Sequence, residues 1–122
     1  MERVFLVLGA LSACIGVAAG AFGAHGLKSR MSAEMLSVFE VGVRYQMYHA
    51  FALMGAAWAQ AKWPSSIVTA GGWLFAIGTV LFSGSLYLLS VSGVRWLGAI
   101  TPLVGVAFLA GWVCLGWGAW KA

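Results

Sequence analysis

The chain has 122 residues, of which 62% are hydrophobic and only 8% are charged. A water-soluble domain typically carries about 25% charged residues, so this composition excludes an ordinary soluble domain. It indicates an integral membrane protein, for which the bilayer is the solvent. The seven lysines and arginines are spread over the connecting segments. This is typical of topology signals and lipid-headgroup contacts, and we expect no nucleic-acid partner.

Four uncharged, apolar stretches are long enough to be transmembrane helices. Even the shortest has 17 residues, which is the minimum for a hydrocarbon core of about 30 Å. The predicted spans are residues 4–24, 45–61, 67–89 and 97–118. The sequence therefore predicts an all-α fold, an integral membrane bundle of four transmembrane helices. Residues 1–122 form a single transmembrane domain with both termini on one side.

The longest charged segment, residues 28–44, connects the first two spans. Ser32 is suited to cap a helix N-terminus, and Glu34 follows in the first turn, where the helix dipole favours an acid. Apolar residues recur every four positions from Met35 onward. This pattern predicts a short amphipathic helix at about residues 32–43 that lies in the membrane interface between the first two spans.

Small residues recur at four-residue spacing, which lets two helix backbones approach closely. The candidate packing positions are Gly16, Gly20, Ala24, Gly84, Ala107 and Gly111. We expect the Gly16 and Gly20 face to pack inside the bundle and Gly84 to admit a neighbouring helix. The face of Ala107 and Gly111 is expected to stay free for another chain. The expected partners are therefore the lipid bilayer and a protein chain, in a homo-oligomer or as a subunit of a larger membrane complex.

Polar side chains are concentrated in one leaflet, where the first and third spans end and the second and fourth begin. This polar cluster consists of His25, Tyr45, Gln46, His49, Ser83, Ser85, Tyr87 and Thr101. Each unsatisfied polar group in hydrocarbon costs several kcal/mol, so we expect these side chains to bond one another. In particular, His49 should reach Tyr45 or a polar group of the first or third span.

The polar cluster has a structural and a functional interpretation. It can supply interhelical hydrogen bonds worth about 1 kcal/mol each, or form a small site for a lipid headgroup, quinone, metal or haem. His25 and His49 differ in depth by roughly 5–8 Å, and no third histidine or nearby aspartate would complete a metal site. No acid is placed to orient a histidine beside Ser83 or Ser85. We therefore predict no catalytic residue, no metal site and no cofactor, with haem and quinone kept as alternatives.

Four blocks of sequence cover most of the chain in order: GAFGAHGL, FEVGVRYQMYHAFAL, GTVLFSGSLYLL and GAITPLVGVAFLAGW. Together they resemble the YgdD/YwdK family of small four-helix bacterial inner-membrane proteins. The resemblance implies a four-span protein of a bacterial plasma membrane, and it implies no reaction, substrate or cofactor.

The sequence thus predicts a small multi-pass protein of the bacterial inner membrane, a non-enzymatic structural or accessory component of a membrane assembly. The alternatives are a binding site for a quinone, lipid headgroup or haem at the polar cluster, and a small permeation pathway. Lys28, Arg30 and Arg44 crowd one connecting segment. This favours a cytoplasmic position for that segment and periplasmic termini.

Overall fold

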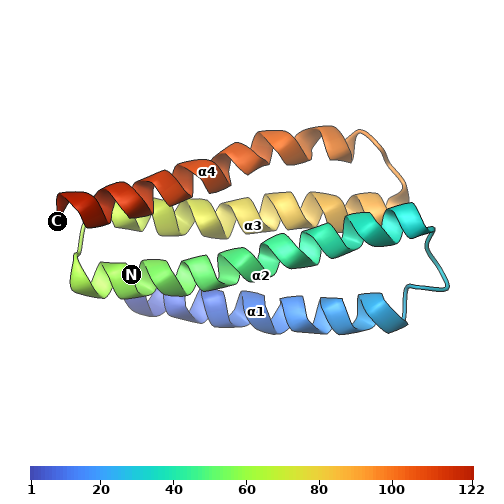
Figure 1. The fold of residues 1–122 in the computed structure, drawn as a ribbon, viewed down its shortest axis with the longest axis horizontal. Coiled ribbons are helices and arrows are strands. Elements are labelled where there is room, and N and C mark those ends of the chain that lie inside the picture. Colours follow the sequence, from blue (N-terminus) through green and yellow to red (C-terminus); the bar gives the residue numbers. More distant parts are fainter.

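Long antiparallel helices make up the fold. The computed structural model describes residues 1–122, apart from the side chain of Ala24, so the packing predicted for Ala24 lies outside the described residues. The helices are α1 (Glu2–His25), α2 (Ala33–Lys62), α3 (Ser66–Ser92) and α4 (Leu97–Lys121). Both termini lie at the end of the molecule that also holds the α2–α3 turn (Figure 1). The predicted all-helical fold is confirmed.

Three helices are long and apolar enough to cross a bilayer, as judged over the described residues. They are Glu2–Gly23, Ser66–Ser92 and Leu97–Lys121. With 24, 27 and 25 residues, α1, α3 and α4 each exceed the roughly 30 Å hydrocarbon core at about 1.5 Å per residue. The remaining helix, α2, is the longest at 30 residues, but its first half carries charges.

The short interfacial helix predicted at about residues 32–43 is wrong as a separate element. Residues 33–62 form one continuous helix, α2. The helix continues through Arg44 because no proline lies between Ala33 and Lys62, and the glycine at position 42 keeps its helical conformation. A change from charged to apolar composition alters the environment of a helix without interrupting its backbone hydrogen bonds.

The helices pack in chain order, α1 on α2, α2 on α3 and α3 on α4, with a smaller contact between α2 and α4. This order forms a row in which α2 and α3 are central and α1 and α4 lie at the two edges (Figure 1). Close approach of α1 to α2 depends on small residues. A Cβ atom at Gly16 would lie 2.6 Å from Met47 Sδ, and one at Gly20 would lie 3.4 Å from Val43 Cγ1.

The face of α4 that was expected to stay free is used inside the molecule. Gly111 is buried, and a Cβ atom there would lie 2.8 Å from the Phe75 ring of α3. Ala107 also borders α3, with its Cβ atom 3.7 Å from the position a Cβ atom would take at Gly78. The prediction that this face receives another chain is wrong, because its small residues bring α4 against α3 instead.

Candidate functional site

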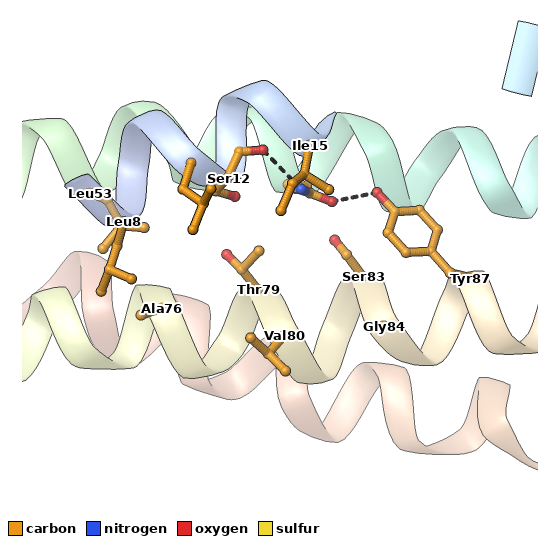
Figure 2. Close-up of a pocket in the computed structure, with 12 residues that line it drawn as sticks. Leu8, Ser12, Ile15, Leu53, Ala76, Thr79, Val80, Ser83, Gly84 and Tyr87 are labelled. Carbon is orange, nitrogen blue, oxygen red and sulfur yellow. Dashed lines mark hydrogen bonds between the residues drawn. The ribbon is translucent and has the colours of Figure 1, made fainter. Parts of the chain in front are cut away.

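A cavity of about 280 Å³ lies between α1 and α3, with α2 forming its floor. Four residues of α1, two of α2 and six of α3 line it (Figure 2): Leu8, Leu11, Ser12, Ile15, Gln46, Leu53, Ala76, Thr79, Val80, Ser83, Gly84 and Tyr87. Two of the wall residues, Leu11 and Val80, are 55% and 71% exposed. The cavity is therefore a groove that opens sideways to the surrounding lipid, and we call it the α1/α3 groove.

The groove exists because α1 and α3 touch at one end and not along their length. Near the start of α1, the Phe5 ring lies directly on Gly72 of α3 and packs edge-on to Trp73. Farther along α3, a Cβ atom at Gly84 would meet nothing within 4 Å. The prediction that Gly84 admits a neighbouring helix is therefore wrong. Its missing side chain instead leaves open space in the groove.

A chain of hydrogen bonds crosses the floor of the groove and joins three helices. Gln46 Nε2 donates to the Ser12 carbonyl of α1 at 2.9 Å, and the Tyr87 hydroxyl of α3 donates to Gln46 Oε1 at 2.5 Å (Figure 2). Ser83 Oγ donates to the Gly42 carbonyl of α2 at 2.7 Å. The three polar-cluster residues Gln46, Ser83 and Tyr87 therefore line the groove and join its three helices by hydrogen bonds.

Ser12, one of the residues that line the groove, carries a second polar group, its hydroxyl, which the sequence did not single out. Its Oγ is buried and has no hydrogen-bond partner among the described residues. A helical serine can bond the carbonyl four residues earlier, as Thr79 Oγ1 does with Phe75 at 2.8 Å. One signal was present in the sequence, because Ser12 carries the only hydroxyl in residues 4–24.

His49 belongs to a different network, which faces α4. Its Nδ1 lies 2.8 Å from the Tyr45 carbonyl, and Trp112 Nε1 donates to its Nε2 at 3.1 Å. Because the indole can only donate, Nε2 is the acceptor and Nδ1 carries the proton. The ring also stacks on Phe108, with centroids 3.6 Å apart at 9°. His49 is thus a neutral imidazole with both nitrogens occupied, held between aromatic rings.

Contrary to expectation, the side chains of Tyr45, Ser85 and Thr101 form no hydrogen bond to either network among the described residues. Ser85 Oγ and Thr101 Oγ1 lie 2.8 Å apart and link α3 to α4. Tyr45 contributes its carbonyl to His49, while its side chain is 37% exposed. The polar cluster therefore divides into separate contacts instead of forming one site.

His25 is exposed at the end of α1 and lies far from His49. Two residues before it, Gly23 packs against Phe39 of α2. His49 lies ten residues farther along α2, about 15 Å away at the helical rise. The two histidines therefore do not face one iron, and the geometry gives no support to a haem with two histidine ligands.

Comparison with known proteins places the chain in a family. Residues 19–105 match the family described as "Protein of unknown function (DUF423)". UPF0382 membrane protein YwdK of Bacillus subtilis (strain 168) is 49% identical over 114 residues, which are 93% of each chain. UPF0382 membrane protein SSP2132 of Staphylococcus saprophyticus is 47% identical over 119 residues, 98% of each chain.

A relative from Escherichia coli (strain K12), UPF0382 inner membrane protein YgdD, is 43% identical over 114 residues, 93% of this chain and 87% of its own. No solved structure matches the chain. The resemblance seen in the sequence is confirmed: the chain is a small membrane protein that belongs to the DUF423 family, the UPF0382 membrane proteins, whose function is unknown.

Proposed function

We propose that this protein is a four-span protein of the bacterial inner membrane that binds a small amphiphilic molecule in the α1/α3 groove and catalyses no reaction on it. The observation that carries the proposal is the groove itself, about 280 Å³ in volume, with the unpartnered Ser12 hydroxyl buried in its wall. Ligand sites are typically concave and mostly apolar, with a few placed polar groups that fix the ligand.

The proposed fourth span is the second half of α2. Residues 45–61 carry no charge between Arg44 and Lys62, a length of about 25 Å at the helical rise. α2 packs along α1 and α3, which are both candidate spans. A helix that lies between two spans and runs antiparallel to both crosses the bilayer with them. The charged first turns of α2 then lie at the headgroup level.

The contacts of the polar side chains support binding over catalysis. Ser83 Oγ donates to a backbone carbonyl, and Ser85 Oγ bonds Thr101 and the Phe82 carbonyl. Both nitrogens of His49 are engaged by Tyr45 and Trp112. A nucleophile needs a general base within hydrogen-bond reach, and these hydroxyls bond other groups.

An inner-membrane location is proposed from the relatives, since the Escherichia coli relative is named an inner membrane protein. A role as an accessory subunit or in a homo-oligomer is compatible with ligand binding. The outer faces of α1 and α4, where Val17 is 62% and Leu103 is 75% exposed, offer apolar surface to a partner chain.

The test is to fill the groove. The substitution Gly84→Leu places a side chain in the open space of the groove. The matched control, Gly116→Leu, places the same side chain in open space on α4. A Cβ atom at either position would meet nothing within 4 Å. Each protein is purified from membranes, washed, and extracted for mass spectrometry of co-purifying small molecules. We expect one amphiphile with the wild type and with Gly116→Leu, and its loss with Gly84→Leu at unchanged helix content. Equal retention by Gly84→Leu, or no specific amphiphile with any protein, would refute the proposal.

A further inference from the structure

The α1/α3 groove has one apolar end and one polar end. Leu8, Leu53 and Ala76 surround the first, and Gln46, Ser83 and Tyr87 surround the second (Figure 2). Ala76 and Tyr87 are eleven residues apart on α3, so the groove is about 16 Å long at the helical rise. The groove is therefore elongated, and its lining changes from apolar to polar along the helix axes.

This gradient has the same direction as that of one bilayer leaflet. Leu53 is nine residues from Arg44 and nine from Lys62, the charges that flank the uncharged part of α2. It therefore lies near the bilayer centre, about 14 Å from either boundary. Gln46 is two residues from Arg44, and Tyr87 packs on Gly42, where a Cβ atom would lie 2.8 Å from its ring. On α2 and α3, the polar end is thus the end of the groove nearer to the headgroup boundary.

The polar end is built for a neutral group. None of the described side chains that line the groove is charged, so a charged ligand head would lose its hydration without gaining a counter-ion. The Ser12 hydroxyl can donate one hydrogen bond and accept others, and it has no partner among the described residues. The Gln46 amide has two N–H donors, of which the bond to Ser12 uses one. These groups match the oxygen of an alcohol, ester or ketone.

We infer that the ligand is a neutral single-chain amphiphile whose oxygen-bearing head bonds Ser12 and Gln46 beside Tyr87 and whose apolar chain follows α1 toward Leu53. This inference rests on the proposed function and adds the head chemistry, the leaflet and the direction of the chain. Two kinds of membrane molecule share this chemistry, a monoacyl lipid with an uncharged head and an isoprenoid quinone.

The experiment uses photolabelling of the purified wild-type protein in lipid nanodiscs. One probe is hexadecanol with a diazirine midway along its chain, and the other has the same chain and a trimethylammonium head. We expect the neutral probe to label peptides that contain Leu8, Leu53 or Ala76, and the cationic probe to label them at least tenfold less. Competition by a monoacylglycerol or by a short-chain isoprenoid benzoquinone identifies the source. Competition by neither would overturn the inference.

Ser12→Ala tests the head contact. One hydrogen bond corresponds to a roughly fivefold to tenfold loss of affinity for the neutral probe, with the folded fraction unchanged. Tyr87→Phe, which keeps the ring on Gly42, provides a second variant at the same end of the groove. If Gly84→Leu blocks labelling while both probes label the wild type equally and Ser12→Ala has no effect, the groove binds a ligand and the inferred head chemistry is wrong. If Gly84→Leu has no effect, the proposed function is wrong as well.

Discussion

Among single residues, Ser12 lowers the stability of the ligand-free protein. A buried hydroxyl without a partner is destabilising by about 1–3 kcal/mol, and Ser12 Oγ has no partner among the described residues. We predict that Ser12→Ala raises the free energy of unfolding of the ligand-free protein by about 1 kcal/mol. The control is Ser83→Ala, which removes the 2.7 Å bond to the Gly42 carbonyl and should lower stability by about 0.6–1.7 kcal/mol. Steric trapping in bicelles measures both, and equal destabilisation would contradict the proposed ligand role of Ser12.

His49 and Trp112 form a buried pair whose energy can be isolated. Trp112 Nε1 donates to His49 Nε2 at 3.1 Å, so His49→Phe leaves an indole N–H without its acceptor. We predict a loss of about 1–3 kcal/mol for His49→Phe and a smaller loss in the double variant with Trp112→Phe. The double-mutant cycle should give a coupling energy of about 0.6–1.7 kcal/mol. A coupling near zero would mean that the hydrogen bond does not stabilise the fold.

Some of the site residues could be predicted from the sequence, but their partners could not. Apolar context and spacing identified Gln46, His49, Ser83 and Tyr87 as polar groups that need partners. Trp112 could not be named as the partner of His49, because the two are 63 positions apart and any of several helix arrangements would satisfy the pattern. Ser12 was missed because one serine in an apolar helix usually bonds its own backbone.

For whole helices, small-residue spacing predicts close approach without naming the neighbour. Gly111 packs on Phe75 of α3, where an added Cβ atom would lie 2.8 Å from the ring. We therefore predict that Gly111→Leu destabilises the α3–α4 pair by about 1–3 kcal/mol through overpacking. Gly116→Leu, whose added Cβ atom meets nothing within 4 Å, should be neutral. Unfolding measurements with light scattering check this, and a change in oligomer size without loss of stability would contradict it.

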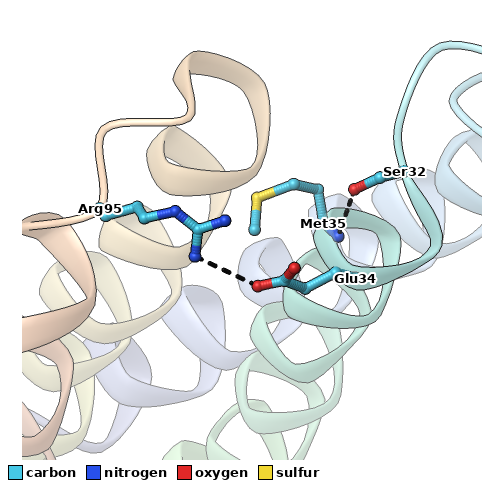
Figure 3. A network of polar contacts seen from close by, with 4 residues as sticks. All are labelled: Ser32, Glu34, Met35 and Arg95. Carbon is cyan, nitrogen blue, oxygen red and sulfur yellow. Dashed lines mark hydrogen bonds and ion pairs between the residues drawn. The ribbon is translucent and has the colours of Figure 1, made fainter.

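The start of α2 combines a correct and an incorrect prediction. The capping role of Ser32 is confirmed, since its Oγ accepts a hydrogen bond from the Met35 N–H at 3.2 Å (Figure 3). The composition also predicted a separate interfacial helix at the start of α2, and this prediction is wrong. Hydropathy indicates whether a helix lies in water or in lipid, and it does not indicate where the helix ends. The ion pair between Glu34 and Arg95, at 3.2 Å, joins α2 to the α3–α4 connection (Figure 3). Both side chains are largely exposed, so we expect a contribution of about 0–1 kcal/mol.

Over the whole molecule, the sequence predicted the helical class, and the two termini lie at the same end of the molecule (Figure 1). The sequence could not predict the row-like packing or the groove. Both depend on which helix faces pack together. The apolar faces of these helices have similar hydropathy, so the sequence pattern does not distinguish between them. The groove arises from two local details, the contact of Phe5 with Gly72 and the open space at Gly84.

Orientation in the membrane is a further prediction for the whole molecule. Lys28, Arg30 and Arg44 crowd the α1–α2 side, which favours a cytoplasmic position for that side and periplasmic termini. A C-terminal alkaline phosphatase fusion should therefore be active, and a C-terminal green fluorescent protein fusion should be dark. The reverse pattern would place the termini in the cytoplasm and the proposed ligand head in the opposite leaflet.

Whether the α1/α3 groove holds a ligand is tested most directly by an experimental structure of the wild-type protein in native lipid. We predict elongated density between α1 and α3 that begins within hydrogen-bond distance of Ser12 Oγ and Gln46 and runs toward Leu53. The same density should be missing from Gly84→Leu and present in Gly116→Leu. A wild-type structure in which α1 closes onto α3 and the protein's own side chains fill the groove would contradict ligand binding.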